Sequence, residues 1–526
     1  MHTILLTTLN ARYAHTALGL RYLYANMGEL QPMTKIVEFT MNEQIQSIAE
    51  ELLKHSPRII GIGVYIWNAS QCSELIQTLK KVSPQTVIVL GGPEAAHLPH
   101  RVDLSRADYI ISGEGEVAFY ELCKEILSPV IPCYDTESTK TQEIPYQVRD
   151  DEKEGQQHKQ PHFIKAPLPD LKSIHLPYSA YNDEDVAHRY IYVEASRGCP
   201  FECEFCLSSI DEKVRNFPLD QLLEEFEILW QRGARSFKFI DRTFNLNMTF
   251  ANRILDFFLS KEPPYFAHFE VIPDHFPEVL KEKIKLFPAG SLQLEIGIQT
   301  LDPLIAKGIN RPLKLEKIVE NLRFLENETH AHMHLDLIVG LPGESIEGFG
   351  RNLDTLVSLT HSEIQIGILK NLSGTTLSRH DKEHGMIYSD TPPYDILQNN
   401  LLSFVQIQKM KRFARFWDIF YNSGSFTKTV PLIWSRGSVF DGFYAFSEWI
   451  YTQTLSTWKI SLERQIALIH AYLCEHHNKE IVEAALIEDL ATRPEKTIPF
   501  FLRQSTQEKK EKEIKAVTPK RQAKRV

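Results

Sequence analysis

Long apolar runs and a dense set of cysteines are both missing from this 526-residue sequence. No hydrophobic stretch approaches the roughly 18 to 20 residues that a membrane-spanning helix needs. The first residues, MHTILLTTLN, lack the basic region and the cleavage site of a signal peptide. Seven cysteines, an odd number, do not suit a secreted disulfide framework. We therefore predict a cytoplasmic protein in a reducing compartment, with no membrane partner.

Basic charge is scarce as well. The chain has 58 Lys and Arg against 68 Asp and Glu, a formal net charge of -10, which disfavours a protein that binds the nucleic-acid backbone. The exception is the segment 505–526, with eight Lys or Arg, three Glu and almost no apolar residues. This composition predicts a disordered, solvated tail. An arm that contacts RNA or a protein partner is the alternative.

The first 130 residues alternate short Ile- and Val-rich runs with helical patterns, as in IIGIGVYI, CSELIQTLKKV and TVIVLGG. Such alternation indicates parallel strands joined by crossover helices. We predict a doubly wound α/β domain over 1–130. Ligands of these domains bind at the carboxyl ends of the strands, where glycine lets the backbone approach closely.

The rest of the chain divides into three stretches. Pro, Gln, Asp, Glu and Lys are scattered through 131–185, which predicts a linker. Six strand-helix units then follow over 186–375 and predict a partial βα barrel of the TIM type, with its working face at the strand C-termini. Residues 376–504 predict a mainly helical domain. Its tryptophans could line a substrate pocket, but their helical spacing favours core packing: Trp417, Trp434, Trp449 and Trp458.

Three cysteines lie within eight positions in the stretch VEASRGCPFECEFC: Cys199, Cys203 and Cys206. Zinc sites normally use four ligands in two pairs, and the other cysteines lie far away in the sequence. A 4Fe-4S cluster held by three cysteines leaves one iron open to another ligand, so three thiolates without a fourth favour this cluster. Gly198 and Pro200 suit a loop that wraps it.

This CxxxCxxC spacing, after the first strand of a βα barrel, resembles the signature of radical S-adenosylmethionine (SAM) enzymes. The resemblance implies that the open iron chelates the amino and carboxylate groups of SAM. It also implies that an electron from the cluster cleaves SAM to methionine and a 5'-deoxyadenosyl radical, chemistry that requires anaerobic conditions.

The remaining strands resemble the radical SAM subclass that contains tRNA methylthiotransferases and oxygen-independent coproporphyrinogen oxidase. The motifs HFEVIPD, GIQT, GINRP and DLIVGLPGE match in barrel order. The resemblance implies SAM contacts by Glu270, Gln299, Arg311 and Asp336, with the Arg311 guanidinium on the SAM carboxylate. The second strand departs from the pattern: it ends FIDRTFN in place of a Gly-rich turn, and Asp241 is expected to replace that turn.

The N-terminal domain, with VIVLGGPEAAHLP and DYIISGEGE, resembles the cobalamin-binding domain of cobalamin-dependent radical SAM enzymes. No DxHxxG motif is present, as is usual in that class. A loop histidine, His15, is interpreted as hydrogen-bonded rather than as a cobalt ligand. A Rossmann-like module that binds nothing is the alternative. The resemblance implies cobalamin contacts by the following residues: Tyr65, Trp67, Asn68, Gly91, Gly92, Gly113 and Gly115.

Three functions are compatible with these motifs. The leading hypothesis is a cobalamin-dependent methyltransferase that acts on an unactivated carbon. The second is a cobalamin-dependent radical rearrangement or ring-forming enzyme without methyl transfer, and the third is a non-catalytic iron-sulfur and corrinoid sensor. The resemblance points to no catalytic residue. It implies a small-molecule or peptide substrate and an electron donor such as flavodoxin or ferredoxin, with nucleic acid disfavoured as a partner.

Overall fold

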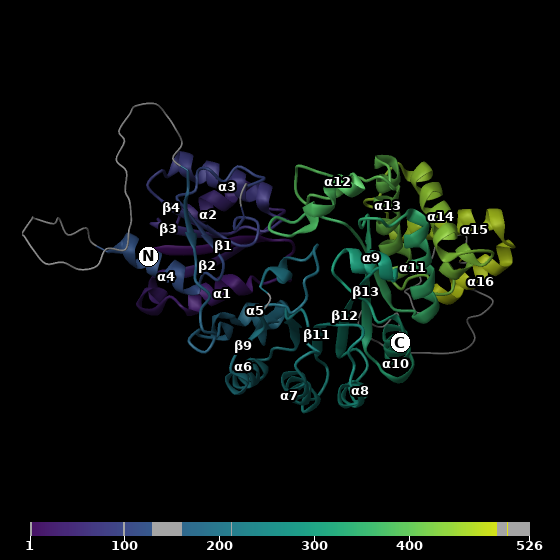
Figure 1. Cartoon of the computed structure of the whole chain (residues 1–526), viewed down its shortest axis with the longest axis horizontal. Helices are drawn as coiled ribbons and strands as arrows, with labels where there is room; N and C mark the ends of the chain where they lie inside the picture. The colour runs from purple at the N-terminus through teal and green to yellow at the C-terminus, as the bar shows by residue number, and fades with distance from the viewer. Residues whose placement is uncertain (1–2, 98–99, 129–159, 212, 492–501, 503–526) are drawn as a thin grey trace, which may run out of the picture. The chain divides into compact units, whose positions relative to one another are not determined.

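The computed structural model describes residues 3–97, 100–128, 160–211, 213–491 and 502. The chain divides into two compact units, Met1–Asp185 and Val186–Val526, which we describe separately (Figure 1). Among the described residues, every helix is too short or too polar to traverse a lipid bilayer.

The first unit is built on a parallel sheet. Its strands follow the order β2-β1-β3-β4-β5-β6: β1 (Ile4–Asn10), β2 (Thr34–Thr40), β3 (Ile59–Gly63), β4 (Val87–Gly91), β5 (Tyr109–Ser112) and β6 (His162–Lys165). All seven residues of β1 are buried because helices cover both faces of the sheet. This confirms the predicted doubly wound α/β fold.

Each face of this sheet has its own hydrophobic core. On one face, α2 (Ile45–Leu53) and α3 (Ala69–Val82) pack Ile48 and Ile76 against Ile60 of β3. The other face is covered by α1 (Leu18–Ala25) and α4 (Glu116–Leu127), whose Leu20 and Phe119 lie in one cluster with Leu6 of β1. A 3-10 turn, η1 (Gly28–Met33), leads from α1 into β2.

The linker predicted at 131–185 needs correction in its described part. Residues 160–185 supply the sixth strand of the sheet, the turn η2 (Tyr178–Ala180) and the start of α5 (Asp183–His188). The buried Arg21 guanidinium lies 2.7 Å from the Asp185 carboxylate and 4.6 Å from the centre of the Tyr181 ring. A few buried aromatic and charged groups therefore hold this segment on the first unit, although its composition is polar. Residues 129–159 lie outside the described part.

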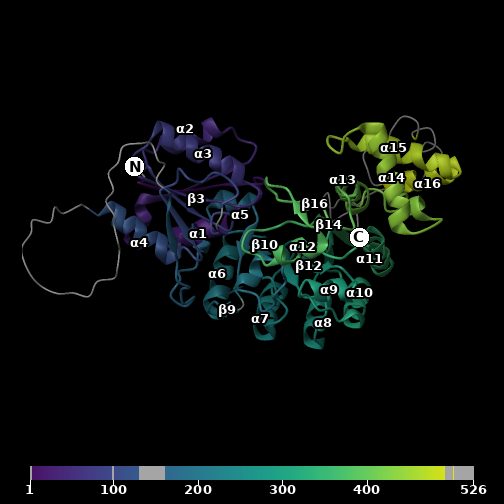
Figure 2. The same cartoon turned by 45° about the horizontal axis from the view of Figure 1, so that its top comes forward.

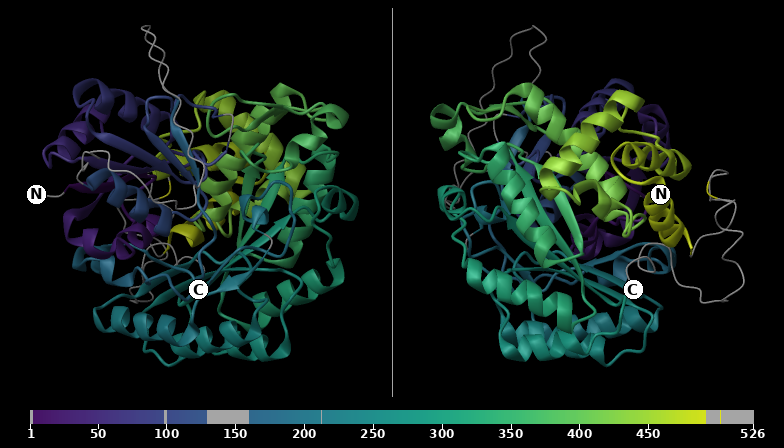
Figure 3. Two further views of the ribbon diagram at one scale, coloured as in Figure 1. Left: turned by 60° about the vertical axis from the view of Figure 1, so that its left-hand side comes forward. Right: turned by 90° about the vertical axis from the view of Figure 1, so that its right-hand side faces the viewer.

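The second unit contains the predicted partial barrel. Its parallel strands lie in the order β14-β13-β12-β11-β10-β7: β7 (Ile191–Val193), β10 (Ser236–Phe239), β11 (Phe266–Val271), β12 (Leu292–Gln299), β13 (His332–Val339) and β14 (Glu363–Ile368). The longer connecting helices lie along one side of this sheet (Figure 3): α6 (Leu219–Gln231), α7 (Met248–Leu259), α8 (Glu278–Lys285), α10 (Leu315–Glu328) and α11 (Ile346–Leu359). The short helix α9 (Pro303–Gly308) follows β12.

Burial alternates along the central strands β12 and β13. One side of each strand carries buried aliphatic residues such as Leu294 and Leu335, which pack toward the helices. The other side carries half-buried polar residues, among them Glu295 and His334, which lie side by side in the register. The inner surface of the barrel is therefore polar.

The C-terminal region continues the second unit. It begins with the short elements η4 (Leu377–His380), α12 (Asp381–His384), β15 (Ile387–Tyr388) and β16 (Ile396–Gln398). The main helices follow: α13 (Phe404–Trp417), η5 (Asp418–Asn422), η6 (Val430–Trp434), α14 (Val439–Thr454), α15 (Leu462–His476) and α16 (Lys479–Leu490). Figure 2 shows α14, α15 and α16 grouped beside α11 and α13. Trp417 is fully buried in this region, as the preferred core interpretation predicts, whereas Trp458 is exposed.

The edge of the barrel sheet is covered by this region. Strand β14 is the last strand of the sheet and packs against α13 and η5. The Asn422 amide oxygen accepts a hydrogen bond from the Ile364 N–H at 3.0 Å, and its amide nitrogen donates to the Ile364 carbonyl at 2.9 Å. One side chain thus satisfies backbone groups that a further strand would otherwise pair with.

Candidate active site

The three clustered cysteines lie in a loop that follows β7 and is closed by two short paired strands, β8 (Ser196–Arg197) and β9 (Arg215–Asn216). Gly198 has φ +89°, and a Cβ there would clash with the Lys213 carbonyl oxygen, so the turn into the loop requires glycine. The Cys199 N–H donates to the Asp211 carbonyl at 2.9 Å. Cys199 and Cys203 are buried and Cys206 is half-buried.

A buried carboxylate anchors the same loop to the C-terminal region. Glu204, which is almost fully buried, lies 2.6 Å from Nε2 of His380 and forms an ion pair with Arg379. These partners are 175 and 176 positions away in the sequence, on η4. No local sequence pattern connects such distant residues, so this contact could not be predicted from the sequence.

One cavity of about 480 Å³ opens at the carboxyl ends of the barrel strands. It brings together seven residues that the sequence analysis selected: Cys199, Cys203, Cys206, Glu270, Gln299, Arg311 and Asp336. The cysteines come from one loop and the other four residues from β11, β12, β13 and the loop after α9. Motifs that are separate in the sequence therefore meet at one cavity in the fold.

Arg311 presents an incompletely bonded cation to this cavity. Its Nη1 lies 3.4 Å from Sγ of Cys203, and its Nη2 donates to the Gly297 carbonyl. Its Nε is buried and has no hydrogen-bond partner among the described residues. A buried, unsatisfied guanidinium N–H is costly, and a carboxylate suits it as a partner. The cavity therefore fits an anionic group beside the cysteine loop.

Local backbone geometry gives Arg311 this position. Strand β12 has an irregularity between Gly297 and Gln299, and Gln299 adopts φ +69°. A Cβ at Gly297 would lie 2.6 Å from Nε2 of Gln299 and 3.3 Å from Nη2 of Arg311. Glycine at this strand position leaves room for both side chains in the cavity.

A second cation, Arg242, lines the cavity and was missed by the sequence analysis. Its Nη1 donates to both carboxylate oxygens of Glu270, at 2.7 and 2.8 Å. Asp336 is half-buried and lines the same cavity. Burial raises the pKa of Asp336 well above its usual value, and the negative charges of Glu295 and Glu270 act in the same direction. The cavity thus combines an ion-paired Glu270 with an Asp336 whose pKa is raised.

Asp241, which was expected to contact SAM, does not line this cavity. Its Oδ2 accepts from the Ala195 N–H at 2.9 Å, and its Oδ1 lies 2.6 Å from the Ser196 hydroxyl. Burial raises the pKa of Asp241 to about 7. The side chain ties the end of β10 to the segment after β7. Its neighbour Arg242 faces the cavity instead.

We expect the replacement of Asp241 by Asn to remove a pH-dependent loss of stability. The pKa of Asp241 in the folded protein, about 7, lies above the usual 3.8. The protonated carboxyl therefore makes its full contribution to the free energy of unfolding below pH 3.8, and this contribution is lost as the pH rises to 7. From pH 5 to pH 8 the wild type should lose about 2 to 3 kcal/mol more unfolding free energy than Asp241→Asn. An asparagine can still accept from Ala195 and donate to Ser196.

Chemical denaturation of both proteins at several pH values measures this difference. Asp220→Asn, at an exposed side chain, is the matched control and should follow the wild type. Parallel stability curves for wild type and Asp241→Asn would show that Asp241 is ionised in the folded protein at all these pH values.

In the first unit, the predicted cobalamin contacts Tyr65, Trp67 and Asn68 follow β3, next to the point between β1 and β3 where the strand order reverses, and the four predicted glycines lie at the ends of β4 and β5. Ligands of doubly wound sheets bind outside the strand ends at this point. Tyr65 and Trp67 stack in parallel there, with ring centres 4.5 Å apart, and Trp67 is 43% exposed. An exposed aromatic surface of this kind suits a flat, largely apolar ligand.

Asn68 needs correction as a ligand contact. Its side chain is fully buried and its amide nitrogen lies 3.1 Å from the Leu9 carbonyl and 3.2 Å from the Gly63 carbonyl. Its amide oxygen accepts from the Tyr65 N–H at 2.7 Å. Asn68 therefore joins the ends of β1 and β3 and shapes the loop that carries Tyr65.

The four selected glycines differ in what surrounds them. A Cβ at Gly91 would meet only the Ile111 carbonyl oxygen, at 3.9 Å, among the described residues. Gly92 has φ +97°, and its Cβ would lie 2.5 Å from the Val64 carbonyl oxygen. Gly113 also has positive φ, and Gly115 faces Leu23. Gly92 is thus required by the fold itself, whereas Gly91 leaves open space for a ligand.

Three family models match the chain in succession. Residues 4–123 match the B12 binding domain, residues 193–356 the Radical SAM superfamily, and residues 382–526 a "Protein of unknown function (DUF4080)". The first two matches coincide with the doubly wound sheet and with the barrel that carries the cavity.

Whole-chain comparisons agree with this division. The chain is 24% identical over 376 residues to the "Uncharacterized methyltransferase PH0819" of Pyrococcus horikoshii, covering 68% of this chain and 77% of that protein. It is also 24% identical over 344 residues to "Cobalamin-dependent radical SAM methyltransferase TokK" of Streptomyces tokunonensis, covering 62% of this chain. It spans about half of that relative's length, 49%.

Solved structures show the same fold. A cobalamin-dependent S-adenosylmethionine radical enzyme, OxsB, with aqua-cobalamin and S-adenosylmethionine bound, matches with a TM-score of 0.56 and 15% identity, covering 99% of this chain and 82% of that one. The radical S-adenosylmethionine methyltransferase TsrM of Kitasatospora setae matches with a TM-score of 0.57 and 16% identity, covering 77% of this chain and 81% of that one.

Proposed function

Because the chain is homologous to cobalamin-dependent radical SAM enzymes, we propose that it is a methyltransferase that uses SAM, a 4Fe-4S cluster and cobalamin to methylate an unactivated carbon. Methyltransferases among its distant relatives support this reaction. The observation that carries the proposal is the cavity on which three cysteines and four SAM-contact candidates converge.

The residues of the cavity fit the two groups that this chemistry requires. Cys199, Cys203 and Cys206 would hold the cluster through three thiolates from one loop. The unpartnered Nε of Arg311, next to Cys203, would receive the carboxylate of SAM. When bound, the cluster supplies the electron that cleaves SAM, and cobalamin supplies a carrier for the methyl group.

The protein side chains have orienting roles in this proposal. Arg311 fixes one end of SAM beside the cysteine loop, and the Gln299 amide offers a donor and an acceptor one strand end away. Glu270 is held in place by its two hydrogen bonds from Arg242, so its carboxylate can accept ribose hydroxyl groups without carrying an uncompensated charge.

The first unit supports the cobalamin part of the proposal. Its sheet has the strand order of a doubly wound domain, and its match to the B12 binding domain covers residues 4–123. Tyr65 and Trp67 offer a stacked aromatic surface at the reversal point, and Gly91 leaves space where the backbone would pass the ligand. We assign these residues to cobalamin and leave Asn68 and Gly92 to the fold.

A small molecule or a peptide is the substrate class that suits the cavity, whose volume of about 480 Å³ lies within the range of small-ligand sites. The negative formal charge of the chain disfavours a nucleic-acid substrate. A flavodoxin or ferredoxin as electron donor belongs to the same proposal, because cluster reduction needs a one-electron source.

The test is anaerobic reconstitution with iron, sulfide and hydroxocobalamin, followed by mass spectrometry of the products formed from SAM with a deuterated methyl group. Methyl transfer yields 5'-deoxyadenosine, S-adenosylhomocysteine and a product that carries the deuterium label. 5'-Deoxyadenosine alone would favour radical chemistry without methyl transfer. The absence of both nucleoside products would favour a sensor and contradict the proposal.

We expect Arg311→Ala to weaken SAM binding by about 1.5 to 3 kcal/mol, the usual range for a hydrogen bond to a charged group. Equilibrium dialysis with labelled SAM on the reconstituted protein measures this loss. Iron content should stay unchanged, because Arg311 is not a cluster ligand. Arg311→Lys keeps the charge without the planar fork and should restore part of the affinity. Equal SAM affinity in wild type and Arg311→Ala would place the SAM carboxylate elsewhere.

A further inference from the structure

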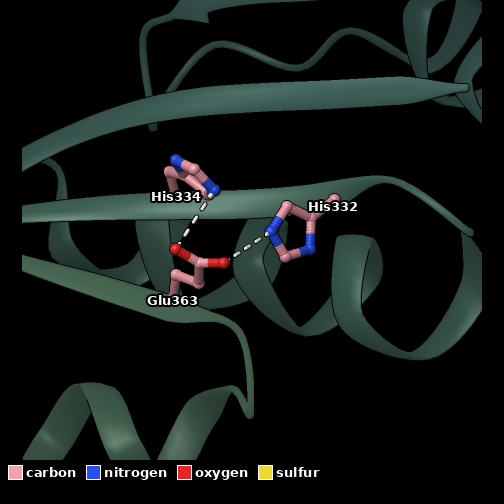
Figure 4. A group of neighbouring side chains, drawn as sticks. All are labelled: His332, His334 and Glu363. Atoms are coloured by element: carbon pink, nitrogen blue, oxygen red, sulfur yellow. Dashed lines mark hydrogen bonds and ion pairs between the residues drawn. The ribbon is translucent and has the colours of Figure 1, made fainter. Parts of the chain in front are cut away.

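We propose that His332, His334 and Glu363 form a binding site for one divalent metal ion of the zinc class, separate from the cysteine loop. The side chains come from the first residues of β13 and β14, at the opposite ends of these strands from the cavity. Figure 4 shows both imidazole rings directed toward the Glu363 carboxylate. Neither the proposed methyl transfer nor the cysteine cluster requires such a site.

The strand register brings these residues together. His332 and His334 are two positions apart on β13, so their side chains leave the strand on the same side. Glu363 is the register partner of His334 on the neighbouring strand. The interior of a βα barrel is usually filled by branched apolar side chains, and polar groups there must be hydrogen-bonded or bound to a metal.

The distances between the ligand atoms suit a metal ion. Nε2 of His332 lies 3.3 Å from Oε1 of Glu363, and Nε2 of His334 lies 3.5 Å from Oε2. The three potential ligand atoms all lie within 4.8 Å of one another. A tetrahedral zinc with Zn–N bonds of about 2.0 to 2.1 Å separates its ligand atoms by about 3.3 Å. Two histidines and one carboxylate are also a donor set that zinc accepts.

The groups around His334 can orient it as a ligand. Metal-binding histidines usually donate their second ring N–H to a carboxylate, which fixes the tautomer. Nδ1 of His334 lies 2.8 Å from Nε2 of Gln365, 3.1 Å from Nε2 of Gln293 and 3.5 Å from Oε2 of Glu295. Because amide nitrogens donate, Nδ1 accepts in this arrangement and Nε2 carries the ring proton toward Glu363. Metal binding at Nε2 would move the ring proton to Nδ1, where the Glu295 carboxylate can accept it once the two amide groups turn their oxygens toward the ring.

The site is accessible and has room for a further ligand. The side chains of His332, His334 and Glu363 are 22%, 16% and 21% exposed. Three protein ligands leave one position of a tetrahedral ion for water or another group. The ion would link β13 to β14. Glu295 lies 3.5 Å from His334 and also lines the cavity. These two residues would therefore connect the ion to the wall of the cavity.

Zinc retention by the full-length, tag-free chain tests the proposal. The chain carries Cys199→Ala, Cys203→Ala and Cys206→Ala so that the thiols cannot bind zinc, and it is dialysed after saturation with zinc chloride. Elemental analysis should find about one zinc that is lost in His332→Gln and in Glu363→Gln. His330→Gln, at an exposed histidine outside the cluster, is the matched control and should retain it. Glu295→Gln should weaken zinc binding by about 10- to 100-fold.

A second measurement covers the case in which the chain with Cys199, Cys203 and Cys206 replaced does not fold. In the wild type with its cluster reconstituted, added zinc should raise the melting temperature, and His332→Gln should abolish this increase without changing the iron content. The proposal would be overturned if His332→Gln and Glu363→Gln retained as much zinc as their parent. It would also be overturned if His332→Gln did not change the effect of zinc on the melting temperature. Either result would leave a His–Glu hydrogen-bond network. Neither result depends on methyl transfer.

Discussion

Replacing Cys199, Cys203 and Cys206 together by alanine is expected to lower the iron content of the anaerobically reconstituted protein from about four atoms per chain to none. The three thiols come from one loop and line one cavity, so no other described group offers a thiolate there. The fold should survive, because the loop is also held by the Cys199 backbone and by Glu204. Iron and sulfide analysis and the visible spectrum measure the change.

Cys474→Ala is the control for this experiment, because Cys474 lies on α15 and should not affect iron binding. Zinc must be measured in parallel. Zinc that disappears together with the three cysteines, in a wild type that takes up no iron, would contradict the cluster assignment. Zinc that depends on His332 would not contradict it.

Enlarging Gly91 is expected to abolish cobalamin binding while the first unit stays folded. A Cβ at Gly91 meets only one described atom within 4 Å, at 3.9 Å, so alanine and then valine should be accommodated. If the nucleotide tail of cobalamin passes this strand end, the added methyl groups occupy its path. We expect a graded loss, partial in Gly91→Ala and complete in Gly91→Val, in a hydroxocobalamin titration followed by ultraviolet-visible spectroscopy.

The neighbouring Gly92 provides the comparison. Its positive φ and the 2.5 Å approach of its Cβ to the Val64 carbonyl oxygen predict that Gly92→Val destabilises the domain before any ligand is added. Circular dichroism and thermal melting separate the two cases. Unchanged cobalamin affinity in a folded Gly91→Val protein would remove this strand end from the ligand site, and a wild type that binds no corrin would remove the methyl transfer proposal.

Most of the fold could be predicted because buried parallel strands are continuous apolar runs. Strands β1 and β3 are buried along their whole length and rich in Ile and Leu, and their order along the chain predicts the doubly wound sheet. Strand β6 escaped prediction because its four residues, HFIK, are mostly exposed at the sheet edge and lie in a polar stretch. Edge strands bury one side at most, so composition identifies them poorly.

The candidate site was predictable where its residues are close in the sequence or follow a motif. The cysteine spacing is local, and Arg311 lies in a recognisable loop. Arg242 was missed by one position, because the direction of a side chain beyond the end of β10 depends on how the chain leaves the strand. The contact of Glu204 with His380 depends on packing between distant segments. The burial of Asn68 depends on the meeting of two strand ends.

The hydrogen bonds between Asn422 and Ile364 limit where this chain can be truncated. An exposed edge strand with free N–H and C=O groups is a template on which other chains add strands, and this leads to aggregation. Here a helical segment from the C-terminal region occupies the outer edge of β14. A fragment that keeps the barrel but ends before α13 would present that edge to other molecules. The C-terminal helices therefore act as a solubility element for the barrel.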